Sequence, residues 1–190
     1  MDEAGRGCLA GPVVAAAVAL VPGVRLPGLR DSKLLSPRVR EELHDLILRR
    51  AEDVAWAWAG PREIDRLNIL NASFLAMRRA IRRLRRPPGA ILVDGHMTIP
   101  QLDILQEAVV DGDALCRSIA AASVVAKVVR DRLMDRCHGI YPDYGFDHNR
   151  GYGTAEHLEA LARHGAVPLH RFSFEPVAMT RQGWLLARSW

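Results

Sequence analysis

The apolar segment PVVAAAVALV, residues 12–21, constrains the fold of this chain more than any other. It is rich in Val, shows no polar alternation and is bounded by Gly11 and Pro22. A strand of this kind must be covered on both faces, since neither face carries side chains suited to water. It is also far shorter than the roughly 20 apolar residues that a membrane-spanning helix requires. The segment therefore predicts a central strand in a layered α/β fold.

Helical and extended patterns alternate along the first half of the chain. Ser36, followed by proline, predicts a helix over 36–50, because Ser caps helix N-termini and Pro is tolerated at the first helical position. The alternation of large and small residues in VAWAWAG, residues 54–60, predicts a second strand. Apolar residues at steps of three and four over 61–86 predict one long helix, or two helices joined near Asn71.

The same alternation continues in the second half. Segment 90–95, AILVDG, predicts a strand that ends in an acid, and segment 105–110 predicts a weaker one. Segment 118–139 predicts a long helix closed by its final glycine, and segment 154–164 predicts a further helix capped by threonine. We find no internal repeat or long linker, so residues 1–190 are expected to form a single α/β domain.

Composition narrows the class of protein. The 190 residues are 49% hydrophobic and 25% charged, which suits one folded domain with its own core. The start of the chain lacks the layout of a signal peptide, and no apolar run is long enough for a membrane span. Three widely spaced cysteines, Cys8, Cys116 and Cys137, form no metal-binding pair and fit a reducing cytoplasm. The net charge of +4 favours an anionic partner only weakly.

Four acids stand at the ends of expected elements, next to glycine or small residues. Acids delivered to the carboxyl ends of separate strands converge in an α/β sheet, although they are distant in sequence. Such carboxylates repel one another unless a cation lies between them, and oxygen donors without His or Cys select Mg²⁺ or Mn²⁺. Any one of these acids taken alone is more often an ordinary cap or turn residue. The four are Asp2, Glu3, Asp94 and Asp113.

The residues around the first pair favour chemistry over capping. In DEAGRGCLAGP, glycines surround a single arginine directly after the two acids and ahead of the central strand. Gly5 and Gly7 allow backbone N–H groups to approach a phosphate or sugar closely, and Arg6 can bind phosphate oxygens with two parallel hydrogen bonds. A lone G-x-G is common in turns, but its fixed spacing after Asp-Glu makes the signal stronger.

Seven segments together resemble bacterial ribonuclease HII. They occur in the order found in that family and span nearly the whole chain. They are DEAGRGCLAGPVVAAAV (2–18), DSKLLS (31–36), EIDRLNILNAS (63–73), ILVDG (91–95), GDALCRSIAAASVVAKVVRD (112–131), YGFDHNRGYGTAEH (144–157) and HRFSFEPV (170–177).

The resemblance implies a fold and a site. The fold is a ribonuclease H-like mixed β-sheet flanked by helices, with a C-terminal helical extension at about 154–190 packed on the catalytic domain. Asp2, Glu3, Asp94 and Asp113 correspond to the family's metal-binding quartet, which holds two Mg²⁺ or Mn²⁺ ions. Asp111 lies two residues before Asp113 and would point to the same side of an extended segment, so it remains an alternative ligand.

The resemblance also implies residues that contact nucleic acid. Gly5, Arg6 and Gly7 are expected to read the 2′-hydroxyl that distinguishes RNA from DNA, together with the adjacent phosphate. Tyr152 resembles the tyrosine that stacks on the sugar beside an RNA–DNA junction; the alternative is a partly buried loop aromatic. The remaining expected contacts are Lys33, Ser123, Lys127, His170 and Arg171.

Basic residues outside these motifs allow two interpretations. Ser123, Lys127 and Arg130 share one face of the helix over 118–139, where Lys127 suits a phosphate contact and Arg130 suits either a phosphate or a structural partner. The stretch RRAIRRLRR, residues 78–86, is typical of a solvated face, with a supporting electrostatic role toward a duplex as the alternative.

The chain departs from the family pattern in three places. Only Met1 precedes the Asp-Glu pair, where relatives carry a strand, so reduced stability or activity is expected. An otherwise identical chain extended upstream, with the same melting temperature and kcat, would contradict that expectation. The loop has His148, Asn149 and Arg150 where the family usually has Arg-His-Lys, and Phe172 replaces a usual arginine.

The resemblance implies an endoribonuclease that cuts the RNA strand of RNA/DNA hybrids and cuts 5′ of ribonucleotides embedded in duplex DNA. Two metal ions would act, leaving 3′-hydroxyl and 5′-phosphate ends. The protein is expected to be a cytoplasmic monomer without membrane contact, and a sliding clamp is a further partner that no motif identifies. The alternatives are another nuclease of this superfold, such as a junction resolvase, and a duplex-binding module with weak or no activity because its first strand is truncated.

Overall fold

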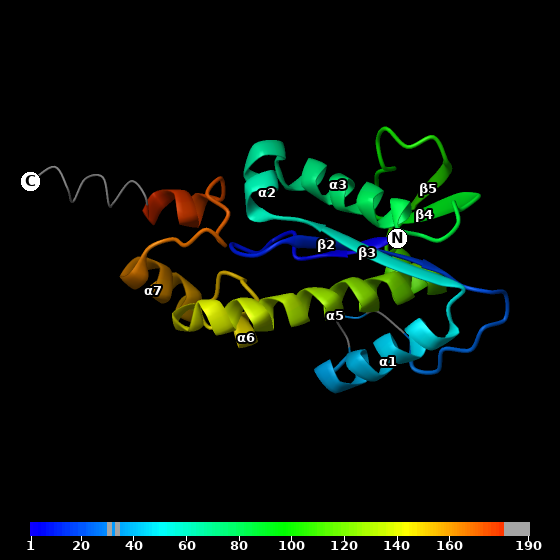
Figure 1. Ribbon diagram of the computed structural model, residues 1–190, viewed down its shortest axis with the longest axis horizontal. Helices are drawn as coiled ribbons and strands as arrows, with labels where there is room; N and C mark the ends of the chain where they lie inside the picture. The colour runs from blue at the N-terminus through cyan, green and yellow to red at the C-terminus, as the bar shows by residue number, and fades with distance from the viewer. Residues whose placement is uncertain (30–31, 33–34, 181–190) are drawn as a thin grey trace, which may run out of the picture.

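The computed structural model of this chain has a β-sheet between two helical layers (Figure 1). It describes residues 1–29, 32 and 35–180. Strands β1 (Asp2–Ala4), β2 (Val13–Ala19) and β3 (Asp53–Ala59) form an antiparallel sheet in the order β1-β2-β3. Strands β4 (Ala90–Asp94) and β5 (Leu105–Val109) form a parallel pair. The mixed sheet expected from the sequence is therefore present.

The backbone of Met1 joins the two strand groups. Its nitrogen donates a hydrogen bond to the carbonyl oxygen of Leu92 at 2.7 Å, and its carbonyl accepts one from the backbone N–H of Asp94 at 3.0 Å. This is the hydrogen-bond pattern of parallel neighbours. The beginning of β1 consequently lies beside the end of β4, which brings Asp2 and Asp94 to one place.

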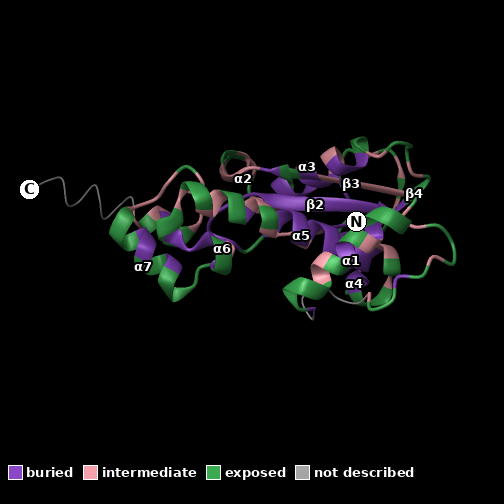
Figure 2. Cartoon of the chain, turned by 60° about the horizontal axis from the view of Figure 1, so that its bottom comes forward, coloured by how far each residue is buried: buried purple, intermediate pink, exposed green. Residues whose placement is uncertain are grey.

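Helices cover both faces of the sheet, as the apolar central strand requires. Helices α2 (Pro61–Leu67) and α3 (Ile69–Arg82) pack on one face, and α1 (Pro37–Arg50) and α5 (Arg117–Ile140) on the other. Figure 2 shows β2 buried along nearly its whole length. Its side chains alternate between two cores, with Val13 facing α3 and Val14 facing α5.

Two predicted helix boundaries are wrong. The helical segment after β3 breaks at Asn68 rather than near Asn71, because Asn68 adopts a positive φ of 67° and its side chain caps α3. Helix α5 does not end at Gly139 but continues through Ile140. A glycine inside a helix lowers its stability without ending it, and here the next apolar residue extends the helix.

The expected helix starts at Ser36 and Thr154 are confirmed. Each side chain accepts a hydrogen bond from the backbone N–H three residues later, and α1 ends at Arg50 as predicted. Helix α7 (Ala155–His164) is followed by its C-cap Gly165, which has a φ of 77°. Residues 175–180 are also helical, so the described part of the expected C-terminal extension contains helix. The shorter elements are α4 (Gly112–Leu115), η2 (Pro142–Tyr144) and α6 (Phe146–Asn149).

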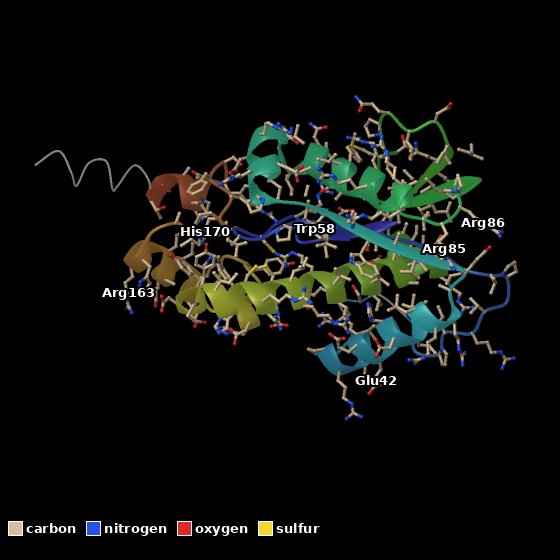
Figure 3. The ribbon with its side chains drawn as sticks, in the orientation of Figure 1. Glu42, Trp58, Arg85, Arg86, Arg163 and His170 are labelled. Carbon is tan, nitrogen blue, oxygen red and sulfur yellow. The ribbon has the colours of Figure 1, made fainter. Side chains whose placement is uncertain are left out.

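Arginines from the RRAIRRLRR stretch bind the edge of strand β3. Arg79 donates to the carbonyl of Trp58 at 2.9 Å and forms a two-point ion pair with Glu63. Arg83 donates to the carbonyl of Trp56 at 2.8 Å and lies over the Trp58 ring. Trp58 itself is exposed (Figure 3). These carbonyls would otherwise be free to pair with another chain. Part of the arginine stretch is thus structural rather than a simple solvated face.

None of the helices in the described ranges combines the length and apolar character needed to cross a membrane.

Candidate functional site

Three carboxylates converge where β1, β4 and α4 meet. Asp2, Asp94 and Asp113 each offer an oxygen atom, and these atoms lie within 4.8 Å of one another. Asp2 and Asp113 are 6% and 7% exposed, whereas Asp94 is half-buried. Residues separated by more than a hundred positions are therefore brought together, although only Asp94 stands at the carboxyl end of a strand, since Asp2 begins β1 and Asp113 lies in α4.

Asp94 also positions the third acid. Its Oδ1 accepts a hydrogen bond from the backbone N–H of Gly112 at 2.8 Å, which fixes the start of α4 and hence Asp113. A Cβ at position 112 would lie 2.6 Å from Ile119 Cδ1 and 3.1 Å from Asp94 Oδ1, so a larger residue would require these side chains to shift. Asp111 is exposed, has a φ of 52° and is not part of the cluster. The structure thus selects Asp113 over Asp111.

Glu3 lies beside the three aspartates but is bound differently. Its Oε1 accepts a hydrogen bond from Arg6 Nη1 at 3.1 Å, within a salt bridge. Among the residues that the structure describes, the carboxylate oxygens that lie within 4.8 Å of one another belong to the three aspartates only. The structure therefore does not place Glu3 in this cluster. Burial raises the pKa of Glu3, and the charge of Arg6 partly offsets this effect.

Burial and mutual repulsion make the ionised cluster unfavourable without a cation. The pKa of Asp2 is raised to about 7, mainly by burial and in addition by the nearby negative charges of Glu3 and Asp94. A hydrogen bond from Ser123 opposes this shift. Ser123 is itself 5% exposed and hydrogen-bonded to Ser32 at 2.8 Å, so it supports Asp2 from within rather than presenting a surface to nucleic acid.

The donor set fits a hard divalent cation. All three clustered ligands are carboxylate oxygens, and no His or Cys joins them among the residues that the structure describes. Oxygen-only sites suit Mg²⁺ and Mn²⁺, whereas Zn²⁺ sites in proteins commonly include His or Cys. A bound cation would also remove the repulsion that raises the pKa of Asp2.

The glycine and arginine turn follows directly after β1. Gly5 has a φ of 93°, and a Cβ there would lie 1.9 Å from Arg130 Nε, so this position requires glycine. A Cβ on Gly7 would meet nothing within 4 Å, so steric contacts do not explain that glycine. The Arg6 side chain is half exposed beside Glu3. The turn therefore presents Arg6 and Gly7 outward next to the acids.

The prediction that His170 and Arg171 contact nucleic acid requires correction. Both residues are 0% exposed. Arg171 donates to the carbonyls of Gly5 at 2.6 Å, Arg6 at 2.7 Å and Gly11 at 3.1 Å. Burial lowers the pKa of Arg171 to about 10, which leaves it charged at neutral pH. These side chains face the interior, and His170 marks where the C-terminal segment meets the N-terminal loop (Figure 3).

His170 forms a buried pair with His157, which the sequence analysis did not identify. Their Nε2 atoms lie 3.1 Å apart, and His157 Nδ1 lies 2.8 Å from the Tyr152 carbonyl. Only a donating Nδ1–H on His157 satisfies that carbonyl, so His170 Nε2–H must donate to His157 Nε2. Both rings are then neutral, in keeping with burial, which lowers the pKa of His170 to about 4.

Tyr152 is a partly exposed aromatic residue on a loop that α7 anchors. Its side chain is partly exposed, the residue being 45% exposed, and its ring lies 6.0 Å from the guanidinium carbon of the buried Arg130. Its carbonyl is held by His157, so the loop that carries the ring is fixed to α7. Burial of its inner part raises the pKa of the hydroxyl. A partly exposed ring on an anchored loop is suited to stacking.

The other expected contacts differ in their surroundings. Lys127 is paired with Asp131 at 2.7 Å, and Asp131 also binds Arg40 of α1 at 3.3 Å. The side chain of Lys127 is still 24% exposed. Arg130 is buried and binds carbonyls, so its structural interpretation holds. Lys33 lies outside the described residues.

Comparisons with known proteins point to one family. The profile of the family described as Ribonuclease HII matches residues 1–177. Ribonuclease HII 1 of Methylibium petroleiphilum is 55% identical over 177 residues, which cover 93% of this chain and 89% of that protein. Ribonuclease HII of Syntrophobacter fumaroxidans is 56% identical over 174 residues, covering 92% and 74% of the two chains.

Solved structures share the fold. The ribonuclease H2 of Pyrococcus horikoshii superposes with a TM-score of 0.81 and 27% identity, covering 97% of this chain and 96% of that one. The RNase HII chain from a complex with PCNA of Archaeoglobus fulgidus gives 0.77 and 29%, with 92% and 93% coverage. Bst-RNase HIII in complex with Mn²⁺ gives 0.73 and 20%, with 95% and 68% coverage.

Proposed function

The chain belongs to the ribonuclease HII family and is a ribonuclease H, and from this premise we propose that it hydrolyses the RNA strand of RNA/DNA hybrids and cuts 5′ of ribonucleotides embedded in duplex DNA. The observation that carries the proposal is the convergence of Asp2, Asp94 and Asp113 beside the outward turn at residues 5–7. Acids that gather a cation and a turn that reads a sugar are the two parts that such a reaction needs.

The chain's own acids would hold two divalent ions, Mg²⁺ or Mn²⁺. When bound, such ions supply an activated water and stabilise the oxygen that leaves the phosphodiester. Asp2, Asp94 and Asp113 provide the ligand oxygens, and Glu3 completes the family quartet from its place beside Arg6. No side chain acts as nucleophile in this proposal, and the products carry 3′-hydroxyl and 5′-phosphate ends.

The turn would select RNA through the 2′-hydroxyl. Its backbone N–H groups can donate to that oxygen, and Arg6 can bind the adjacent phosphate. Tyr152 would stack on the neighbouring sugar from its anchored loop. Lys127 would contact the phosphate backbone through the exposed part of its side chain. His170 and Arg171 are not included as contacts, since both are buried.

We further propose that the protein is a single-domain cytoplasmic monomer, with residues 154–180 of the expected extension packed on the catalytic part; residues 181–190 lie outside the described residues. Its three cysteines are free, which fits a reducing compartment. A sliding clamp is a candidate partner, because the Archaeoglobus fulgidus RNase HII was solved in complex with PCNA.

The direct test uses a DNA duplex that carries one ribonucleotide, an all-DNA duplex, a branched DNA junction and a long RNA/DNA hybrid, each with Mg²⁺ or with Mn²⁺. We expect cleavage of both ribonucleotide-containing substrates and none of the all-DNA duplex. Asp94→Asn should abolish cleavage, while the matched control Asp111→Asn should retain it. Cleavage of branched DNA alone would instead indicate a junction resolvase, and binding without cleavage would indicate a silent duplex-binding module.

A further inference from the structure

Two buried arginines bind the carbonyl groups of the loop that contains the outward turn. Arg171 binds the carbonyls of Gly5, Arg6 and Gly11, as described above. Arg130 of α5 donates to the carbonyls of Pro12 at 3.1 Å and Ala10 at 3.3 Å. Five carbonyl oxygens between residues 5 and 12 are therefore held from below by two rigid guanidinium groups.

These contacts fix the direction of the N–H groups on the other side of the turn. In a trans peptide unit the C=O and the N–H of the next residue point in opposite directions. Because the carbonyls of Gly5 and Arg6 point inward to Arg171, the N–H groups of Arg6 and Gly7 point outward. Within the described ranges, neither of these N–H groups donates to another protein group.

Both guanidiniums lack acidic partners. Neither Arg130 nor Arg171 forms an ion pair with any residue that the structure describes, although both are at most 1% exposed. Their charge is compensated mainly by the carbonyl dipoles, so a positive field persists beneath the turn. Such a field favours an anionic or oxygen-rich ligand above it.

Asp65, on the face of the sheet opposite α5, anchors the residues that follow Arg171. Its carboxylate on α2 accepts hydrogen bonds from the backbone N–H groups of Phe172 at 3.1 Å and Ser173 at 2.8 Å, and from the Ser173 hydroxyl at 2.7 Å. The residues that follow Arg171 are thus anchored on an element that does not belong to the acid cluster. Asp65 is therefore a second position at which a substitution can disturb the placement of Arg171.

We propose that Arg171 is a positioning residue for substrate recognition, which holds the N–H groups of Arg6 and Gly7 toward the ribose and so sets the discrimination between RNA and DNA. The inference rests on the proposed function. Asp65 acts through Arg171 and has a smaller effect. A lysine at position 171 keeps the charge but cannot bind three carbonyls in one plane.

The test measures discrimination rather than activity. In an Asp94→Asn background kept in EDTA, so that no cleavage occurs, the Kd is measured for a duplex with one ribonucleotide and for the all-DNA duplex. The ratio of the two values does not depend on the folded fraction of the preparation. We expect Arg171→Lys to reduce this ratio about tenfold, because a site built to bind a hydroxyl owes its selectivity to well-aligned donors. Asp65→Asn should reduce it less.

Arg79→Lys is the matched control, since Arg79 also binds a backbone carbonyl and two further acceptors but lies on the edge of β3. It should leave the ratio unchanged. An unchanged ratio in Arg171→Lys overturns the inference. If Arg171→Lys does not fold, an unchanged ratio in Asp65→Asn overturns it instead. A parent protein with a ratio of one would overturn the proposed substrate recognition itself, and this inference with it.

Discussion

The acid cluster and the arginine pair, Arg130 and Arg171, both bury charge beside the N-terminal segment at residues 2–12. They differ in how that charge is compensated. Asp2, Asp94 and Asp113 bring like charges within 4.8 Å of one another, and the pKa of Asp2 is raised to about 7. Arg130 and Arg171 are more deeply buried, but together they bind five carbonyls. The acid cluster needs a bound cation to neutralise its charge, whereas the two arginines find their hydrogen-bond partners within the protein.

The difference separates function from stability. Carboxylates in a site that must bind a cation are kept although they cost folding free energy, whereas fully bonded groups contribute rigidity. Substitutions in the arginine pair should therefore lower the free energy of unfolding. Substitutions in the acid cluster should leave the stability nearly unchanged but lower the activity. Four predictions follow this contrast.

The largest effect is expected from Asp94→Asn. Loss of one ligand charge should lower kcat/KM about 1,000-fold, which corresponds to about 4 kcal/mol of transition-state stabilisation. The Tm in metal-free buffer should stay the same or rise, because repulsion falls while the amide oxygen can still accept from Gly112. Steady-state kinetics and calorimetry measure the two quantities. A clearly lowered Tm would show that the cluster stabilises the fold and would break the contrast.

The next effect concerns stability alone. Arg130→Met should lower the free energy of unfolding by about 3 kcal/mol, since it leaves the buried carbonyls of Ala10 and Pro12 without donors. Urea unfolding provides the measurement. Arg38→Met on the exposed face of α1 is the matched control, and its change should stay below about 0.5 kcal/mol. Equal losses in the two variants would contradict the prediction.

A third effect comes from the cation. Mn²⁺ at about 100 times its Kd should stabilise the unmodified protein by about 2.7 kcal/mol, since the ion binds the folded state only. The shift in Tm with and without the ion measures this gain. In Asp94→Asn the shift should be much smaller at the same concentration. A shift of equal size in both proteins would place the ion elsewhere.

The smallest effect is a pair of opposite pH dependences in buffer with EDTA. The lowered pKa of His170, about 4, means that the unfolded chain binds a proton more readily, so His170 makes stability rise with pH from about 4 to 6.5. The raised pKa of Asp2, about 7, means that the folded chain holds the proton, so Asp2 makes stability fall between about pH 4 and 7.

Each slope amounts to about 1.4 kcal/mol per pH unit at most, and the two partly cancel. Asp2→Asn should therefore steepen the rise in stability with pH, and His170→Gln should flatten it. Urea unfolding at pH 4.5, 5.5 and 6.5 tests both variants. Identical profiles for the two would mean that neither group titrates with the assigned sign.

The sequence predicted the acid cluster better than the arginine pair for a physical reason. Acids at strand ends are placed by local signals, since a strand that ends in Asp-Gly delivers its side chain to a known edge of a sheet. The position of Arg171 depends on contacts with Gly5 and Arg6, which lie some 165 residues away, and no local pattern encodes them. From the sequence alone, His170 and Arg171 are therefore expected to contact nucleic acid at the surface, although both are buried.

The helix boundaries teach a similar lesson. The caps at Ser36 and Thr154 were predictable, because a side chain that binds the N–H three residues later is a local interaction. The break at Asn68 rather than near Asn71 depends on a positive φ at one residue, which the apolar spacing of three and four does not reveal. The choice between Asp111 and Asp113 likewise required the backbone conformation.

The contact between Arg171 and the turn also sets an order of events during protein synthesis. Contacts between residues far apart in sequence must wait until both have left the ribosome, and chains grow at about 5–20 residues per second. Asp2, Asp94 and Asp113 can assemble once the first two thirds of the chain exist. The turn gains its inward support only after Arg171 has been added, roughly ten seconds to half a minute after Gly11 at these rates. A nascent chain can thus contain the three aspartates before Arg171 is available to support the turn.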